Sequence, residues 1–189
     1  MNILYISKSI IPSRSANSIH VMKMCQAFAD NGHDVTLLAP DVKNKYEKNV
    51  TNIYEYYGLK KIFNIKKLFH PNLIGGAFLY TMAIFFYLLF NRRFDLVYGR
   101  FLHGVYVATL LNNNVIYETH LPTSDKNNHR LTVFKKLIKS KYLKKMVVIS
   151  QALKNIYLEK KYLNDFKIQV AHDGADEVKN FNNKIKLLG

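Results

Sequence analysis

The sequence predicts an α/β domain with a Rossmann-like, doubly wound, mostly parallel sheet of about seven strands and helices on both faces. Short apolar runs, each suited to one buried strand, alternate with helical patterns along the whole chain. Parallel neighbours need a crossover connection, usually a helix, so such sheets are covered on both faces. With 189 residues, 49% of them hydrophobic, the chain is large enough for one domain with a sizeable core.

The chain opens with a strand–loop–helix–strand unit. Ile3–Ile6 and Val35–Ala39 are each predicted to form a buried strand, and apolar residues recur at helical spacing between 19 and 28. Asn31-Gly32 supplies the helix stop, because glycine adopts the left-handed conformation without a side-chain penalty. The loop Lys8–Ser18 is expected at the carboxyl edge of the sheet, where ligands bind, leading into a helix amino terminus that suits a phosphate. The sequence has no G-x-G-x-x-G motif and no Walker loop, which argues against a dinucleotide cofactor.

The central part of the chain holds three further segments. Ile53–Tyr57 is interpreted as a strand, and Leu59–Phe69 mixes apolar residues with four lysines. We interpret this basic segment as a surface helix or loop, and a patch lying on anionic lipid is the alternative. Gly75–Phe90 is the most apolar segment, but its sixteen residues are fewer than the ~20 needed to span a bilayer, so a buried helix is expected.

The second half of the chain continues the alternation. Helices are expected at Phe101–Leu111, His129–Tyr142 and Gln151–Lys160, the last capped by Ser150, and strands at Asp95–Tyr98, Val115–Thr119, Met146–Ile149 and Ile168–Ala171.

The chain is strongly basic. It contains 28 Lys and Arg against 13 Asp and Glu, a formal charge of +15, which favours phosphorylated ligands, nucleic acid or an acidic membrane surface as partners. The densest cluster comprises Lys135, Lys136, Lys139, Lys141, Lys144 and Lys145. A solvated face is the first interpretation of this cluster and an anionic membrane or lipid-linked pyrophosphate the second. Nucleic acid is disfavoured, because no recognised nucleic-acid motif accompanies the charge.

The only cysteine, Cys25, lies within the first helical pattern. We expect a buried thiol in a reducing compartment, because no adjacent base is evident to activate it. Met1–Ile11 has neither the basic start nor the long apolar run of a secretory signal.

Several motifs, in this order, together resemble the amino-terminal half of a family 4 retaining glycosyltransferase of the GT-B fold. They are Met1–Ser7, Pro12 with Ser15-Ala16 and His20-Val21, Gly32–Val35, Phe94–Tyr98, Tyr117–His120, Val147–Ser150 and Asp173–Asp176. In that family two Rossmann-like domains face each other across a cleft; the first binds mainly the acceptor and the second most of the nucleotide sugar. The resemblance implies a domain at residues 1–176, with 177–189 leading to a donor-binding domain absent from this sequence. It places Asp173, Gly174 and Asp176 near the junction between the two domains.

The resemblance also assigns a donor-phosphate loop. Ser15 and Ala16 stand where the family usually has a Gly-Gly pair that lets the backbone approach the phosphates of the donor. The missing glycines reduce the room for a phosphate oxygen, although the helix amino terminus still suits an anion. Asn17 and Ser18 are candidates to donate hydrogen bonds to the phosphate, and a simple helix cap by either residue is the alternative.

His120 is the catalytic candidate, because the family has a histidine here, near the reacting sugar. It is expected to bind the donor sugar or phosphate and to orient the acceptor hydroxyl; a structural loop histidine is the alternative. Arg100, just past a predicted strand, is expected to hold an acceptor phosphate or carboxylate, or to form a surface salt bridge. Glu118 is expected to contact the acceptor or to orient a neighbour, or else to face solvent, and His33 is expected to be structural.

The predicted function is transfer of a sugar from a nucleotide-sugar donor, with retention, to a polysaccharide or glycolipid precursor of the cell surface. The family implies no cofactor and no required metal; its partners are the donor and a glycan or lipid-linked acceptor, with no nucleic acid. The expected location is the cytoplasm, including peripheral attachment to the inner face of the membrane. The isolated chain is expected to be inactive, because most donor contacts belong to the second domain. The alternative is a non-catalytic basic module that binds membranes or polyanions.

Overall fold

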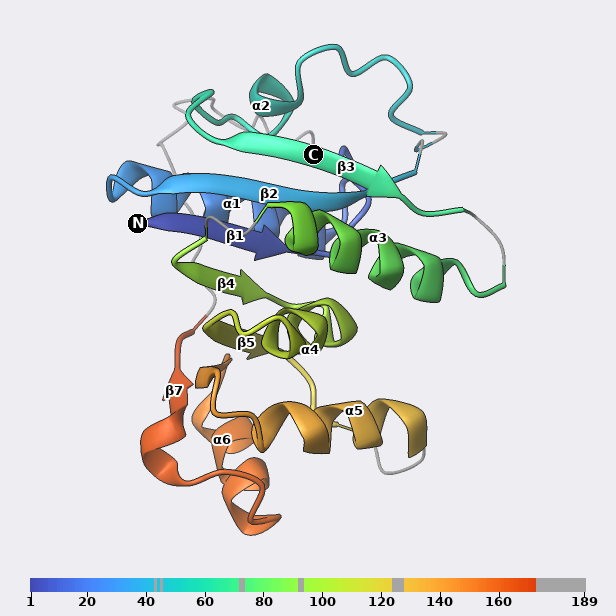
Figure 1. Cartoon of the computed structure of the whole chain (residues 1–189). Helices are drawn as coiled ribbons and strands as arrows, with labels where there is room; N and C mark the ends of the chain where they lie inside the picture. The colour runs from blue at the N-terminus through green and yellow to red at the C-terminus, as the bar shows by residue number, and fades with distance from the viewer. Residues whose placement is uncertain (43, 45, 72–73, 92–93, 124–127, 173–189) are drawn as a thin grey trace, which may run out of the picture.

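The sheet contains seven strands, all parallel, in the order β3-β2-β1-β4-β5-β6-β7 (Figure 1). The computed structural model describes residues 1–172 except 43, 45, 72–73, 92–93 and 124–127. The strands are β1 (Asn2–Ile6), β2 (Asp34–Asp41), β3 (Asn64–Phe69), β4 (Leu96–Gly99), β5 (Val115–Thr119), β6 (Leu143–Val148) and β7 (Ile168–Val170). The helices are α1 (Ala16–Asp30), α2 (Ile53–Tyr56), α3 (Gly76–Phe90), α4 (Leu102–Leu110), α5 (Asn128–Ile138) and α6 (Gln151–Glu159).

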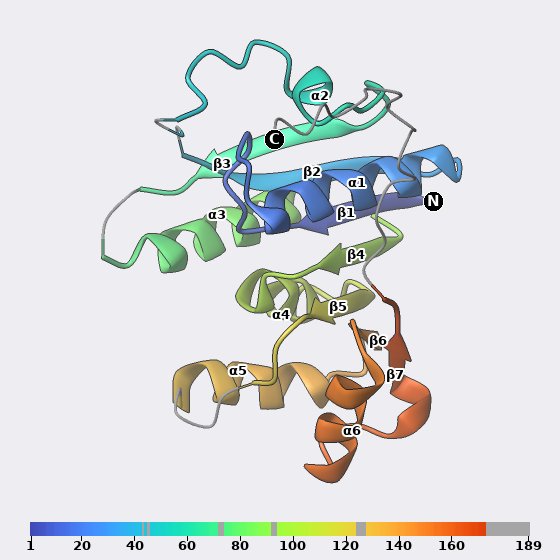
Figure 2. The ribbon, with the colours of Figure 1, turned by 180° about the vertical axis from the view of Figure 1, so that it is seen from behind.

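Helices cover both faces of the sheet, as predicted. Helices α3, α4, α5 and α6 contribute side chains to one buried cluster, and α1 with the α2 segment packs on the other face. Figures 1 and 2 show these two layers from opposite sides. The central strand β1 serves both clusters, because Ile3 and Tyr5 point to the α1 face while Leu4 and Ile6 point to the α3 face. The doubly wound fold predicted from the sequence is therefore confirmed.

The connection after β1 runs to β2 on one side, and the chain later returns to place β4 on the other side of β1. The strand order reverses at this point, and in open α/β sheets a ligand crevice lies there, beyond the carboxyl ends of the strands. Strands β1 and β4 approach closely at Gly99, where an added Cβ would lie 2.5 Å from the carbonyl oxygen of Ile6. Only glycine fits at this position.

The opening unit forms as the sequence predicts. Ser15 caps α1 by accepting a hydrogen bond from the backbone N–H of Ser18. The helix ends at Asn31-Gly32, and Gly32 has the positive φ of 79° that the stop requires. Cys25 is fully buried in the α1 face of the core.

Two of the expected elements are wrong. Ile53–Tyr57 was predicted as a strand but contains the short helix α2, whose amino end is capped by the side chain of Asn52. The segment Leu59–Phe69 was predicted as a surface helix or loop, yet its second half is the edge strand β3, paired with β2. Its lysines mask the strand pattern, because an edge strand with exposed positions on both faces need not alternate strictly.

The apolar segment Gly75–Phe90 forms α3, a helix of 15 residues that packs on β3 and α4. Among the described residues, no helix combines the length and apolarity needed to cross a membrane. The remaining helices and strands lie where the sequence placed them, within a few residues at each end, and Ser150 caps α6 as expected.

Candidate active site

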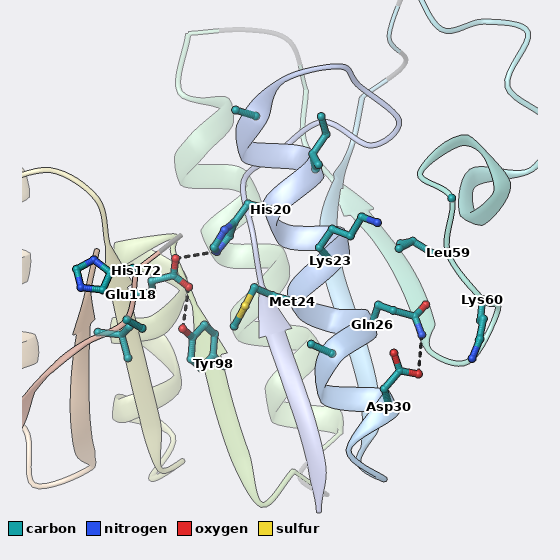
Figure 3. A pocket seen from close by; sticks show the side chains of 16 residues that line it. His20, Lys23, Met24, Gln26, Asp30, Leu59, Lys60, Tyr98, Glu118 and His172 are labelled. Atoms are coloured by element: carbon teal, nitrogen blue, oxygen red, sulfur yellow. Dashed lines mark hydrogen bonds and ion pairs between the residues drawn. The ribbon is translucent and has the colours of Figure 1, made fainter. Parts of the chain in front are cut away.

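Three elements bring polar side chains together at the carboxyl edge of the sheet. Arg100 follows the last residue of β4, His120 follows the last residue of β5, and His20 lies in the first turns of α1. Because β4 and β5 are parallel neighbours, the residues after them emerge at the same edge. Helix α1 begins after the loop that follows β1, so its amino-terminal turns lie at this edge too (Figure 3).

Glu118 is the centre of the cluster, and only 3% of it is exposed. Its Oε1 lies 2.6 Å from Nε2 of His120, 2.9 Å from Nε2 of His20 and 3.6 Å from Nε of Arg100. The Tyr98 hydroxyl donates a hydrogen bond of 2.7 Å to the other oxygen, Oε2. One buried carboxylate is thus surrounded by four groups that carry donors or positive charge.

These neighbours keep Glu118 ionised. Burial alone raises the pKa of its carboxyl, but hydrogen bonding and the charge of His20, with hydrogen bonds from Tyr98 and His120, outweigh burial and lower the pKa to about 2. An ionised carboxylate can only accept hydrogen bonds, so the Nε2 atom of His120 must donate to it. Conversely, burial and the adjacent Glu118 raise the pKa of the Tyr98 hydroxyl, which keeps that group protonated as a donor.

The two imidazoles are close neighbours. The ring centroids of His20 and His120 lie 5.1 Å apart with the planes nearly perpendicular, at 86°. About a fifth of each side chain is exposed, so both rings border solvent while their inner nitrogens face Glu118. Such a pair can present N–H donors or positive charge to an anionic ligand at the strand tips.

Arg100 is also partly buried, with 15% of its side chain exposed. One of its terminal nitrogens is buried, and no described residue accepts a hydrogen bond from it. The guanidinium therefore retains donor capacity beside the two imidazoles. This geometry disfavours the surface salt bridge that the sequence left open as an alternative, because the carboxylate facing Arg100 is in the interior.

Hydrogen bonds within the loop before α1 fix its conformation. The Ser18 hydroxyl donates to the backbone oxygen of Ser13 at 2.6 Å, and the Asn17 amide donates to the Ser9 hydroxyl. The helix cap is Ser15, so the alternative of a cap by Asn17 or Ser18 is wrong. Ser15, Ala16 and Asn17 are exposed, whereas Ser18 is fully buried and oriented into the loop.

A groove of about 820 Å³ runs along α1 and reaches this cluster. Figure 3 shows His20, Glu118, Tyr98 and His172 on one side of α1 and Lys23, Gln26 and Asp30 further along the helix. The Gly58–Lys60 segment and Val147 also line the groove. The groove gives the buried cluster an open approach from the α1 face of the sheet.

His20, Glu118 and His120 also form a conceivable metal-ligand set. Each offers one ligand atom, and these three atoms lie within 4.8 Å of one another. Two imidazoles and a carboxylate suit several divalent transition metals. The Arg100 guanidinium 3.6 Å from the same carboxylate oxygen opposes a dication electrostatically, which disfavours a divalent metal here.

Sequence comparison decides the family. A profile of glycosyltransferase family 4 matches residues 18–179, most of the chain and nearly all of the structure just described. The chain belongs to glycosyltransferase family 4. A search of curated protein sequences gave no significant match.

Solved structures with the same fold include several glycosyltransferases. Anabaena HepE in complex with UDP and glucose has a TM-score of 0.63 at 13% identity over 93% of this chain and 45% of its own. Sucrose-phosphate synthase from Thermosynechococcus elongatus has a TM-score of 0.64 at 12% identity, and the match covers 93% of this chain and 49% of the synthase. Arabidopsis thaliana UGT89C1 complexed with UDP-L-rhamnose has a TM-score of 0.55 at 12% identity, and the match covers 89% of this chain and 51% of UGT89C1. The chain thus spans about half the length of these proteins and forms one half of a GT-B fold.

Within this family 4 domain, the structure brings together three residues singled out from the sequence, His120, Arg100 and Glu118. It adds His20, which the sequence analysis noted in a family motif but did not assign to the site. The sequence feature that could have assigned His20 to the site is its position in the first turns of the predicted helix, just after the loop at the carboxyl edge of the sheet. Three other candidates, Asp173, Gly174 and Asp176, lie outside the described residues. His33 lies in the turn after α1, where its backbone N–H donates a hydrogen bond to the carbonyl oxygen of Phe28.

Proposed function

We propose that this chain is the acceptor-side half of a retaining glycosyltransferase that moves a hexosyl-type sugar from a nucleotide-sugar donor to a surface polysaccharide or glycolipid precursor. The observation that carries the proposal is the buried Glu118 carboxylate, which holds His20, His120 and Arg100 at the tips of the central strands. Their positive and donor groups suit a ligand that carries phosphate. UDP in the HepE structures and UDP-L-rhamnose in UGT89C1 support a nucleotide-sugar donor.

In this proposal His120 touches the ligands and Glu118 acts through it. Retaining transfer builds positive charge on the sugar ring and negative charge on the leaving phosphate. An N–H of the imidazole pair or the Arg100 guanidinium stabilises that phosphate oxygen, and such preorganised donors are effective because they need no reorganisation during reaction. Glu118 is too buried to bind an acceptor directly, so its proposed role is to fix the orientation and protonation of the imidazoles.

A second domain is required for the complete site. The chain spans 45% of HepE and 49% of sucrose-phosphate synthase. We propose that residues 1–176 form the acceptor domain and that 177–189 lead to the donor-binding domain, with Asp173, Gly174 and Asp176 near the junction. The exposed Ser15, Ala16 and Asn17 backbone would then face the donor phosphates, with fewer contacts than a Gly-Gly loop allows. The enzyme would work in the cytoplasm.

The test compares His120→Ala with His33→Ala in the protein that contains both domains. With nucleotide sugar and acceptor, the His120 change should lower kcat roughly 10²-fold or more, as for loss of a positioned catalytic group, while His33→Ala stays near wild type. The 189-residue chain alone should show no turnover. Wild-type kcat for His120→Ala, or measurable transfer by the isolated chain, would contradict the corresponding part of the proposal.

A further inference from the structure

Helix α3 has an outer face that is unusual for a surface helix. Tyr80, Ile84 and Leu88, one helical turn apart, are buried against the sheet. The side chains pointing away include Phe78, Phe86 and Phe90, which are 67%, 50% and 80% exposed. The helix contains no charged residue at all. We call the exposed set Ile74, Phe78, Leu79, Phe86 and Phe90 the α3 face.

Cations and no acidic residues accompany this apolar surface. Helices α3, α4 and α5 lie side by side on the same face of the sheet, and none contains Asp or Glu (Figure 1). Helix α5 exposes Lys135 and Lys136. On the edge strand β3, Lys66 pairs with Leu38 and therefore points to the α3 side of the sheet. The apolar strip thus has Lys66 of β3 along one side, while the lysines of α5 lie beyond α4 on the other.

We propose that the α3 face docks on an anionic lipid membrane, with its phenylalanines in the interface and the flanking lysines on the headgroups. Charge decides between lipid and a second copy of the chain. Two copies, each with a formal charge of +15, repel each other, whereas an acidic leaflet attracts the lysines. Exposed aromatic side chains next to lysines also match the composition of surfaces that lie in the membrane interface.

The docked orientation brings the sheet edge that carries the candidate active site near the lipid, while the groove along α1 opens on the opposite face of the sheet. The Tyr80 hydroxyl, in the first turns of α3, donates a hydrogen bond of 2.6 Å to the carbonyl of Ser7, immediately after β1. The amino-terminal end of α3 therefore lies at the same sheet edge as His20 and His120. Docking would present this edge beside the membrane, which suits an acceptor carried on a lipid. This last step rests on the proposed function; the docking itself does not.

The experiment measures sedimentation of the 189-residue chain with vesicles, so it needs no transfer activity. The vesicles contain phosphatidylcholine alone or mixed with phosphatidylglycerol, each at low and high salt. The test variant is Phe78→Glu with Phe86→Glu. The matched control is Tyr46→Glu with Phe166→Glu, two exposed aromatic residues outside the α3 face that receive the same added charge. Thermal unfolding verifies that each variant is folded.

Wild type and control should bind the anionic vesicles, and the test variant should bind roughly tenfold or more weakly because its apolar contacts are lost. High salt should weaken wild-type binding, since the lysine contribution is screened. If the double variant does not fold, Lys135→Glu with Lys136→Glu replaces it and should weaken anionic binding, by about fivefold for each lysine charge lost.

Equal vesicle binding by wild type and the folded test variant would overturn the proposal, as would no wild-type binding to anionic vesicles. A dimer in light scattering that the test variant abolishes would assign the α3 face to a second copy instead. Loss of transfer through His120→Ala in the two-domain protein concerns the active site and leaves this measurement unaffected, so the two proposals fail separately.

Discussion

Replacing Glu118 by glutamine tests whether the buried carboxylate organises the site. Glutamine keeps the shape of the side chain but removes its charge, and its NH₂ group would face donors on Tyr98, His20 or His120 where the carboxylate oxygens now accept. The substitution thus removes the charge on which the cluster depends without creating a cavity. The expected result is a less stable domain with a loosened pair of imidazoles.

The magnitude follows from the pKa of the carboxyl. It falls from 4.5 to about 2 in the folded protein. A tenfold change in acid dissociation corresponds to about 1.4 kcal/mol, so the ionised form contributes about 3 kcal/mol to the free energy of unfolding at neutral pH. For a chain of this size, that loss lowers Tm by roughly 6–12 °C.

The stabilisation by the Glu118 carboxylate should depend on pH in a defined direction. Because folding lowers the pKa, the stabilisation is fully present above about pH 4.5 and is lost as pH falls towards 2, where the carboxylate gains a proton. The difference in unfolding free energy between wild type and Glu118→Gln should therefore shrink across that interval. Urea unfolding followed by circular dichroism, repeated at several pH values, measures it.

Glu159→Gln is the matched control, since Glu159 is exposed at the end of α6. It should unfold like wild type at every pH. The reasoning is refuted if Glu118→Gln is as stable as wild type at neutral pH. A stability loss that stays constant down to about pH 2 would also refute it, because the loss would then come from packing and not from charge.

Three further substitutions test the supports around the site. Tyr98→Phe removes the donor to Oε2 of Glu118, so the pKa of Glu118 should rise and acid unfolding, followed by fluorescence, should begin at higher pH. Tyr80→Phe removes the hydrogen bond to the Ser7 carbonyl and should cost about 1 kcal/mol in urea unfolding; no change would mean that water replaces the hydroxyl. Gly99→Ala places a Cβ against the Ile6 carbonyl and should destabilise by about 1–3 kcal/mol; wild-type stability would contradict the close approach of β1 and β4.

The helices and strands were largely predictable from the local pattern, and the exceptions have a physical reason. The segment Ile53–Tyr57 resembles a strand in composition, but Asn52 caps it and no neighbouring strand pairs with it among the described residues. The segment Leu59–Phe69 has helical spacing of its apolar residues, but β2 offers an unpaired edge that Asn64–Phe69 completes. Tertiary pairing overrides a weak local preference.

Part of the site was predictable from strand ends. Arg100 and His120 follow strands whose carboxyl ends share one edge, and that follows from a parallel sheet without coordinates. The assignment of His20 to this site required the structure, because its distance from Glu118 depends on how α1 crosses the sheet. The exposure of the α3 phenylalanines likewise could not be predicted, because the sequence of this segment is apolar throughout and indicates a helix buried on all sides.

The sequence by itself determined the alternation of strands and helices, the excess of positive charge and the family motifs, because periodicity, charge and residue order are local properties of the chain. Only the tertiary structure decided that Glu118 is buried beneath two imidazoles and a guanidinium, and that one side of α3 is left uncovered. Both depend on which residues distant in sequence come into contact, and a side chain's charge state and exposure are set by those contacts.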